Sequence, residues 1–328
     1  MPPAAAQRAG GLRRGRGAVA ALPRASRRLG RIDRTRLEAL AFVLPAACLI
    51  LLLVAYPLLH VVWDSVHNVD LVDPTATGFS GFDNFATVLT ADDFVPALWH
   101  TASWTLLSVA GEYALGLISA VALAQPIIGR AVFRGIIVVP WVIPIVVAGL
   151  TWTWMLAPDF GVTNAWLMQL GIIRHARFWL GDTGTALLAI TVVNIWRSFP
   201  FYTISLLAAL QSIPEELHEA AALDGAGAWA RFRAVTWPHI RPVSAALVMI
   251  HVIWTAINFD FIWVMTEGGP LHASETLPIL IYRYALQTYD VGAASALATM
   301  LIGFLVAALS VFWFAVLRPR RAAMEAAA

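Results

Sequence analysis

Two stripes of mostly polar side chains lie inside long apolar segments, where polar groups are costly and usually face a helix bundle or a solute path. The first repeats at i, i+3, i+4 and i+7 and the second at i, i+4 and i+7, so each occupies one helical face. The stripes consist of Asn194, Arg197, Ser198 and Phe201, and of His251, Thr255 and Asn258. Such side chains bind by hydrogen bonding, so the stripes indicate a shared cavity for a polar solute at the middle of the membrane.

The same side chains could instead form hydrogen bonds between helices that hold a bundle together. Arg197 could pair with Asp260, could contact a solute, or could extend its charged end out of the apolar layer. Glu112 lies in another apolar segment without an obvious partner, and its residue type indicates only a hydrogen bond in the interior. The sequence leaves these alternatives open.

Six apolar segments are long enough to position such stripes inside a bilayer as helices. The chain is 59% hydrophobic and 13% charged, with a mean hydropathy of +0.73, which is too apolar for a water-soluble surface. We therefore predict an all-α, polytopic membrane protein with six transmembrane helices. The predicted spans are residues 40–63, 98–124, 135–157, 185–210, 242–266 and 291–317.

The arginines predict the orientation of these spans. All 22 basic residues are arginine, and 18 of them lie in residues 1–36, in the loop 125–134, in the segment 211–241 and in residues 318–328. The loop 64–97 has six aspartates and no arginine. Because cytoplasmic loops carry the excess of positive charge, we expect both termini and the segment 211–241 to be cytoplasmic.

The same reading divides the chain into three parts. Residues 1–36 are rich in Arg, Ala, Gly and Pro and are predicted to be a disordered basic cytoplasmic tail that can touch anionic membrane lipid. Residues 37–318 form the transmembrane domain, and residues 319–328 form a second cytoplasmic tail.

Residue types also exclude several kinds of chemistry. The chain has no lysine, so it cannot contain a Walker A phosphate loop or a Schiff-base lysine. Its eight histidines lack metal-ligand spacing, and no nucleophile triad or cofactor motif is visible. We therefore predict no catalytic residue, no metal site, no cofactor and no nucleic-acid partner. A membrane-embedded enzyme, the alternative from another class, would need a cluster of acidic or histidine residues at a membrane face.

The segment 211–241 is a polar, helix-forming island between two predicted spans. Ser212 and Glu215 have the spacing of a capping box, which predicts a helix start, and Gly225 suits the left-handed conformation at a helix end. A second short helix is predicted over 228–235, ending before the next proline. Such a helix pair at the membrane face is expected to bind something soluble. The alternative is an amphipathic helix pair that lies on the membrane or packs only within the chain.

This island resembles a motif of a known family. The matching residues are Glu219-Ala220-Ala221, Asp224-Gly225-Ala226, Phe232, Val235 and Pro238. They are similar to the EAA loop of binding-protein-dependent ABC importer permeases, which implies the type I importer permease architecture. By this resemblance the loop is a coupling helix that seats in a groove of an ATPase, with Glu219 in contact and Gly225 permitting the turn. The implied coupling residues are Glu219, Ala220, Ala221, Asp224, Gly225 and Pro238, and Trp237 departs from the usual aliphatic residue.

Two further motifs resemble the carbohydrate branch of that family, in particular subunits like the larger maltose permease. They are Thr266-Glu267-Gly268-Gly269-Pro270, followed by Thr276 and Leu277, and Gly81-Phe82-Asp83-Asn84-Phe85. The resemblance covers residues 37–318 and implies a sugar substrate. The positions that match sugar contacts are Asn194, Ser198, Phe201, His251, Thr255 and Asn258, of which only the two asparagines keep a familiar residue type. A permease for a non-sugar solute is the alternative.

The resemblance also implies partners and a location. A second homologous permease subunit would complete the path, and a dimer of cytoplasmic ABC ATPases would hydrolyse ATP. An extracellular or periplasmic sugar-binding protein would deliver the sugar. The location implied is the bacterial or archaeal cell (inner) membrane.

Overall fold

The computed structural model describes residues 34–73, 75 and 77–314. The predicted tail 319–328 and residues 1–33 of the predicted tail 1–36 lie outside the described residues. The chain divides into two units, Met1–Ala55 and Tyr56–Ala328. The described part of the first is helical throughout, with α1 (Arg34–Ile50) running into the π-helix η1 (Leu51–Ala55).

The second unit begins with α2 (Tyr56–Asp64) and a short antiparallel hairpin of β1 (His67–Asn68) and β2 (Gly78–Phe79). Helices make up nearly all of the rest. In order, they are α3 (Asp83–Thr90), α4 (Phe94–Ala124), α5 (Arg130–Val142), α6 (Ile145–Met155), α7 (Val162–Gln169), α8 (Ala186–Gln211), α9 (Glu215–Leu223), α10 (Ala228–Arg231), η2 (Phe232–Thr236), α11 (Trp237–Ala256), α12 (Asp260–Thr266), α13 (Leu277–Leu286) and α14 (Val291–Phe312).

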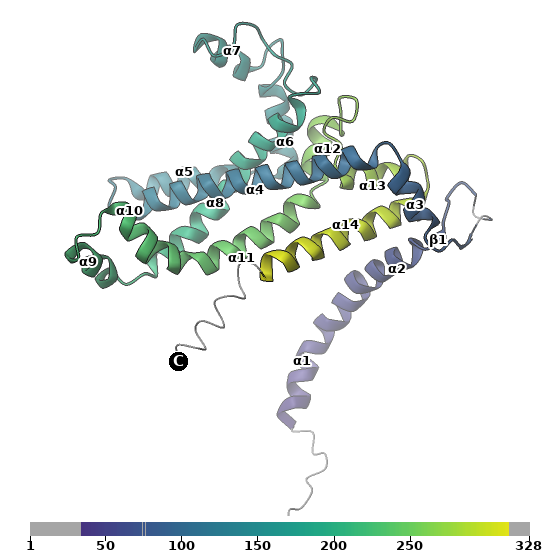
Figure 1. The fold of residues 1–328 in the computed structure, drawn as a ribbon, viewed down its shortest axis with the longest axis horizontal. Coiled ribbons are helices and arrows are strands. Elements are labelled where there is room, and N and C mark those ends of the chain that lie inside the picture. Colours follow the sequence, from purple (N-terminus) through teal and green to yellow (C-terminus); the bar gives the residue numbers. More distant parts are fainter. Residues whose placement is uncertain (1–33, 74, 76, 315–328) are drawn as a thin grey trace, which may run out of the picture. The chain divides into compact units, whose positions relative to one another are not determined.

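The predicted all-α membrane architecture is confirmed. Within the described residues, five helices are long and apolar enough to cross a membrane, and the bent pair α5 and α6 makes six if it counts as one span. The five are Leu40–Asp64, Phe94–Ala124, Ala186–Gln211, Ala228–Ala256 and Val291–Phe312. In Figure 1, α4, α5, α8, α11 and α14 run beside one another, and α8 packs along the length of α4.

The third span is not the continuous helix predicted over 135–157. Helix α5 ends at Val142, and α6 continues at an angle of 94°. Pro144 lies at the break, and the residue before it, Ile143, has the extended conformation with φ −64° and ψ 129°. The ring of a proline disfavours helical backbone in the preceding residue, so Pro144 explains the break.

The fifth span also differs from its predicted bounds. The helical stretch starts at Ala228 rather than at Pro242, and it ends at Ala256, before the separate helix α12. The predicted stop before Pro238 is wrong, because the π-helix η2 leads directly into α11 and the helical stretch Ala228–Ala256 continues through this proline.

Candidate functional site

Glu112 on α4 lies at the centre of a buried polar cluster between α4, α8 and α11. Its Oε1 atom accepts a hydrogen bond of 2.9 Å from the side-chain amide of Asn194 on α8. Its Oε2 atom lies 2.7 Å from Nδ1 of His251 on α11. The Glu112 side chain is 0% exposed, and both partners are buried. The structure thus joins one residue of each predicted stripe to an acidic residue of a third span, a partnership that the sequence did not indicate.

Two more residues of the first stripe lie near the same carboxylate. Ser198 is buried beside Glu112, and the half-buried guanidinium of Arg197 is within its electrostatic reach. Asp260, the other partner considered for Arg197, is exposed at the start of α12, and the ion pairs of the described residues do not include these two. With one acidic and one basic side chain, the cluster is close to neutral.

An aromatic surface covers the His251 side of this cluster. The ring of His251 lies 5.2 Å from Phe201 and 5.5 Å from Trp254, measured between ring centroids. Phe201 in turn lies 5.7 Å from Trp141 on α5. Trp141 and Trp254 are exposed, so with Phe201 they form an aromatic wall that spans α5, α8 and α11. Sequence reasoning missed both tryptophans, although Trp254 follows His251 by three residues and so shares its helical face.

The last two residues of the second stripe lie farther along α11 and make local contacts. Thr255 is buried, and its backbone carbonyl accepts a hydrogen bond of 2.9 Å from the indole N–H of Trp104. The side-chain oxygen of Asn258 accepts one of 3.1 Å from the backbone N–H of Phe261, at the start of α12. The contacts of these two residues stabilise the end of α11, and their predicted solute contacts stay predictions.

The first EAA-like residues lie on α9 and in the turn after it, whereas Phe232 and Val235 lie on η2 and Pro238 lies at the start of α11. Gly225 has φ +78°, and the N–H groups of Gly225 and Ala226 bond back to the carbonyls of Ala222 and Ala221, each at 3.0 Å. These bonds form a Schellman motif, which confirms the predicted helix end. The predicted capping box is wrong. The hydroxyl of Ser212 instead bonds to the carbonyl of Ala209, because α8 continues to Gln211 and Ser212 closes its C-terminus.

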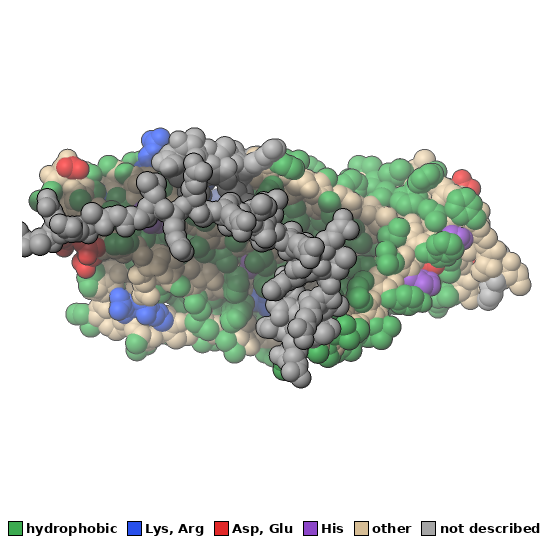
Figure 2. All heavy atoms as spheres, turned by 90° about the horizontal axis from the view of Figure 1, so that it is seen from below, with side chains coloured by type: hydrophobic (Ala, Val, Ile, Leu, Met, Phe, Trp, Pro, Cys, Tyr) green, Lys and Arg blue, Asp and Glu red, His purple; other side chains and the backbone are tan. Residues whose placement is uncertain are grey.

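The island has one face packed on the spans and one face open. Ala221 packs against a small buried cluster that contains Ile213, Val235 and Ile240. On the open side, Glu219 is exposed, Leu223 is 90% exposed and Trp229 is 73% exposed. Large exposed apolar side chains mark a surface that meets a protein partner or the membrane. Figure 2 shows acidic and arginine side chains gathered at the end of the molecule where α9 and α10 lie.

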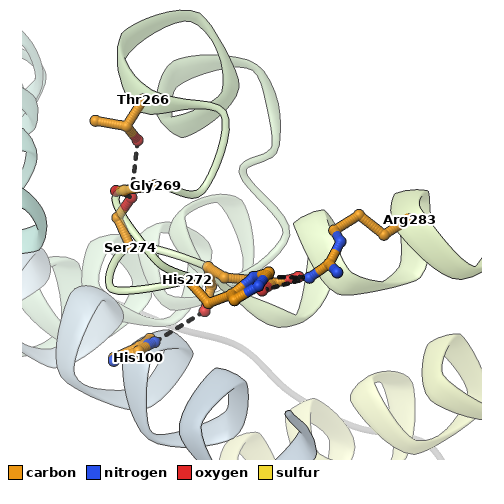
Figure 3. A network of polar contacts seen from close by, with 7 residues as sticks. His100, Thr266, Gly269, His272, Ser274 and Arg283 are labelled. Carbon is orange, nitrogen blue, oxygen red and sulfur yellow. Dashed lines mark hydrogen bonds and ion pairs between the residues drawn. The ribbon is translucent and has the colours of Figure 1, made fainter. Parts of the chain in front are cut away.

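The motif after the fifth span folds into a tightly bonded loop between α12 and α13, shown in Figure 3. The carboxylate of Glu275 is almost fully buried and lies 2.5 and 2.7 Å from Nη1 of Arg283 on α13. His272 contacts the same carboxylate, and the ring of His100 on α4 lies 3.0 Å from the carbonyl of Glu275. These contacts anchor the loop to two helices at the end of the bundle opposite to α9.

Known membrane transport proteins are similar to this chain over most of its length. The family model described as binding-protein-dependent transport system inner membrane component matches residues 112–323. The trehalose/maltose transport system permease protein MalF of Thermococcus litoralis is 34% identical over 79% of this chain and 88% of its own length. The diacetylchitobiose uptake system permease protein DasB of Streptomyces coelicolor is 36% identical over 79% of this chain and 81% of its own.

A solved structure shares the fold. It is a chain of a bacterial ABC transporter involved in the import of the acidic polysaccharide alginate, with a TM-score of 0.73 and 25% identity. The match covers 88% of this chain and 96% of that chain.

Proposed function

We propose that this chain, which belongs to the family of binding-protein-dependent transport system inner membrane components, takes part in sugar import. Members of this family are multi-pass membrane permeases of ABC importers with the type I fold. The chain is therefore a transport component and not an enzyme, and ATP hydrolysis belongs to a separate subunit. The solute, the partner chains and the orientation are parts of the proposal.

The observation that carries the proposal is the aromatic wall next to a nearly neutral polar cluster. Sugars have apolar ring faces and many hydroxyl groups, so aromatic rings together with amide and imidazole groups suit them. Phe201, Trp254 and Trp141 supply the rings, His251 supplies a polar group directly behind two of them, and Asn194 bonds to the same carboxylate as His251. The relatives named for trehalose/maltose and diacetylchitobiose support the same class of solute.

An acidic polysaccharide, the cargo of the transporter that shares the fold, is disfavoured by the charges near this wall. Arg197 is the basic side chain of the two stripes, and Glu112 lies within its electrostatic reach. An anionic solute would compete with Glu112 for that guanidinium. We therefore expect a neutral sugar.

The surface of α9 supports coupling to an ATPase. In the proposal, Glu219 and the exposed Leu223 contact the ATPase, while the packed face of α9 passes movement to α8 and α11. A second homologous permease would face the aromatic wall and close the path, and a sugar-binding protein would deliver the solute at the opposite end. The arginine distribution supports a cytoplasmic side for α9 and both termini, and the proposed location is the membrane of a bacterial or archaeal cell.

The test is uptake into liposomes that contain the whole transporter, with a panel of labelled neutral mono- and disaccharides, an acidic sugar and a polyamine. We expect uptake of at least one neutral sugar, dependent on ATP and on the binding protein. Uptake of the acidic sugar or the polyamine alone would overturn the assignment to sugars.

A second measurement tests the coupling residues. The double variant Glu219→Ala with Gly225→Ala should lose sugar uptake while the outer face still binds the loaded binding protein. Normal uptake in this variant would reject the coupling role of α9.

A further inference from the structure

Glu112 has no assigned part in the path, yet its carboxylate bonds to both predicted stripes. The two contacts join residues that are 82 and 139 positions away in the chain. Asn194 and His251 come from different spans, so Glu112 links α8 and α11 through a third helix, α4. A fully buried acidic side chain in a membrane span is costly unless it is hydrogen-bonded, which marks Glu112 as a residue with a role.

The backbone around Glu112 is built for this contact. Gly111 and Gly116 flank it on α4, and both lie against α8. A Cβ atom on Gly116 would lie 2.3 Å from Cβ of Tyr202, and one on Gly111 would lie 2.4 Å from the side chain of Ile195. Small residues let two membrane helices approach closely. The two glycines thus bring α8 near enough for the carboxylate to reach Asn194.

His251 stands between Glu112 and the aromatic wall. Its Nδ1 atom is held by the carboxylate, and its ring contacts Phe201, Trp254 and Tyr202, with centroid distances of 5.2, 5.5 and 4.4 Å. A hydrogen bond on one ring nitrogen fixes both the tautomer and the plane of an imidazole. The plane of the His251 ring therefore sets the surface against which Phe201 and Trp254 rest.

We propose that Glu112 is a positioning residue for the solute, which acts through His251 on the aromatic wall of Phe201 and Trp254. The inference rests on the proposed function, because the wall is the surface offered to the sugar ring. Glu112 itself is buried and does not touch the solute. Its bond to His251 holds the two aromatic rings at the angle that distinguishes one sugar from another.

The experiment measures discrimination, which a general loss of folding does not change. Two neutral sugars that the wild-type transporter carries, both delivered by the same binding protein, are compared by their ratio of uptake rates in Glu112→Gln and in His251→Phe. The phenylalanine keeps a flat ring behind the wall but has no nitrogen to bond. We expect each variant to change the ratio by about tenfold, within the range of coupling between residues in contact.

The double variant Glu112→Gln with His251→Phe decides whether Glu112 acts through His251. We expect it to show the same ratio as His251→Phe alone, since the bond is already absent. Ser108→Ala, a change at another fully buried polar residue of α4, is the matched control and should leave the ratio unchanged. Independent, multiplying effects of the two substitutions, or equal slowing of both sugars in each variant, would overturn the proposal.

The set of variants still tests the proposal if one of them assembles poorly. If Glu112→Gln does not assemble, the comparison of His251→Phe with wild type still stands. A wild-type ratio in His251→Phe would then refute the role of Glu112. Failure of the sugar assignment is seen separately, as a wild-type transporter that carries none of the neutral sugars. The same ratio is then measured for two solutes that it does carry.

Discussion

Gly116→Ala should force α4 and α8 apart at a point where their backbones are close. An added Cβ would lie 2.3 Å from Cβ of Tyr202, 3.2 Å from the carbonyl oxygen of Phe199 and 3.2 Å from the backbone nitrogen of Thr203. Two of these atoms belong to the backbone of α8, and Tyr202 Cβ is fixed to it. No side-chain rotation removes the overlap, so the helix itself must move.

The expected cost follows from this rigidity. Overpacking a filled core costs about 1–3 kcal/mol, and Gly116→Ala should fall at the upper end of that range. Gly111→Ala should cost less, because the atoms in its way are the flexible end of Ile195. Gly303→Ala on α14 meets nothing within 4 Å and is the matched control. At that position alanine should stabilise the protein by about 0.4–1 kcal/mol, because it lowers the conformational entropy of the unfolded chain.

The assay is the thermal midpoint of the purified transporter in one detergent, read for the three variants beside wild type. A shift of about 2–4 °C per kcal/mol is expected for a domain of about 150–250 residues, so the order of midpoints should be Gly303→Ala, Gly111→Ala, Gly116→Ala from highest to lowest. Equal midpoints for Gly116→Ala and Gly303→Ala would refute the close approach of α4 and α8, and with it the way Glu112 reaches Asn194.

Two further predictions concern the loops. Asn164 is buried and forms four hydrogen bonds to Ala157, Arg177 and Trp179. Asn164→Ala should therefore lower the stability by about 1–3 kcal/mol, because it leaves buried groups unpaired. Protease cleavage in residues 157–185 should become faster, and an unchanged rate would contradict the contacts. Glu275→Gln keeps the shape of that side chain but removes the charge that pairs with Arg283, so amide hydrogen exchange in residues 267–276 should speed up, whereas Arg283→Lys should have a smaller effect. Equal exchange in both variants and wild type would show that the ion pair does not anchor the loop.

The helical spans and the helix end at Gly225 could be predicted because their signals are local. A run of apolar residues that is long enough to cross a bilayer predicts a span wherever it occurs. Gly225 marks a helix end because glycine tolerates φ +78°. The errors were also local. Ser212 has the residue type of an N-cap, but α8 extends to its neighbour, so the same hydroxyl closes a different helix. Pro238 suggested a stop, but the helical stretch Ala228–Ala256 continues through it.

The sequence indicated only some residues of the candidate site. Helical spacing placed Asn194 with Ser198, and His251 with Thr255, because residues at i and i+4 share a face whatever the fold. Spacing within one helix carries no information about which face of another helix it meets. Glu112 therefore had no visible partner, and the wall formed by Trp141 and Trp254 could not be inferred from a search for polar residues.

Residue order alone thus determined the membrane class, the helical content and the motif of the permease family, since all three depend on composition and near neighbours. The tertiary structure decided that an acidic side chain on α4 bonds to residues of α8 and α11, because that contact depends on two glycines through which α4 and α8 approach. It also decided which aromatic rings stand in front of the cluster. These contacts join residues 82 and 139 positions apart in the chain, and no pattern within a single span records them.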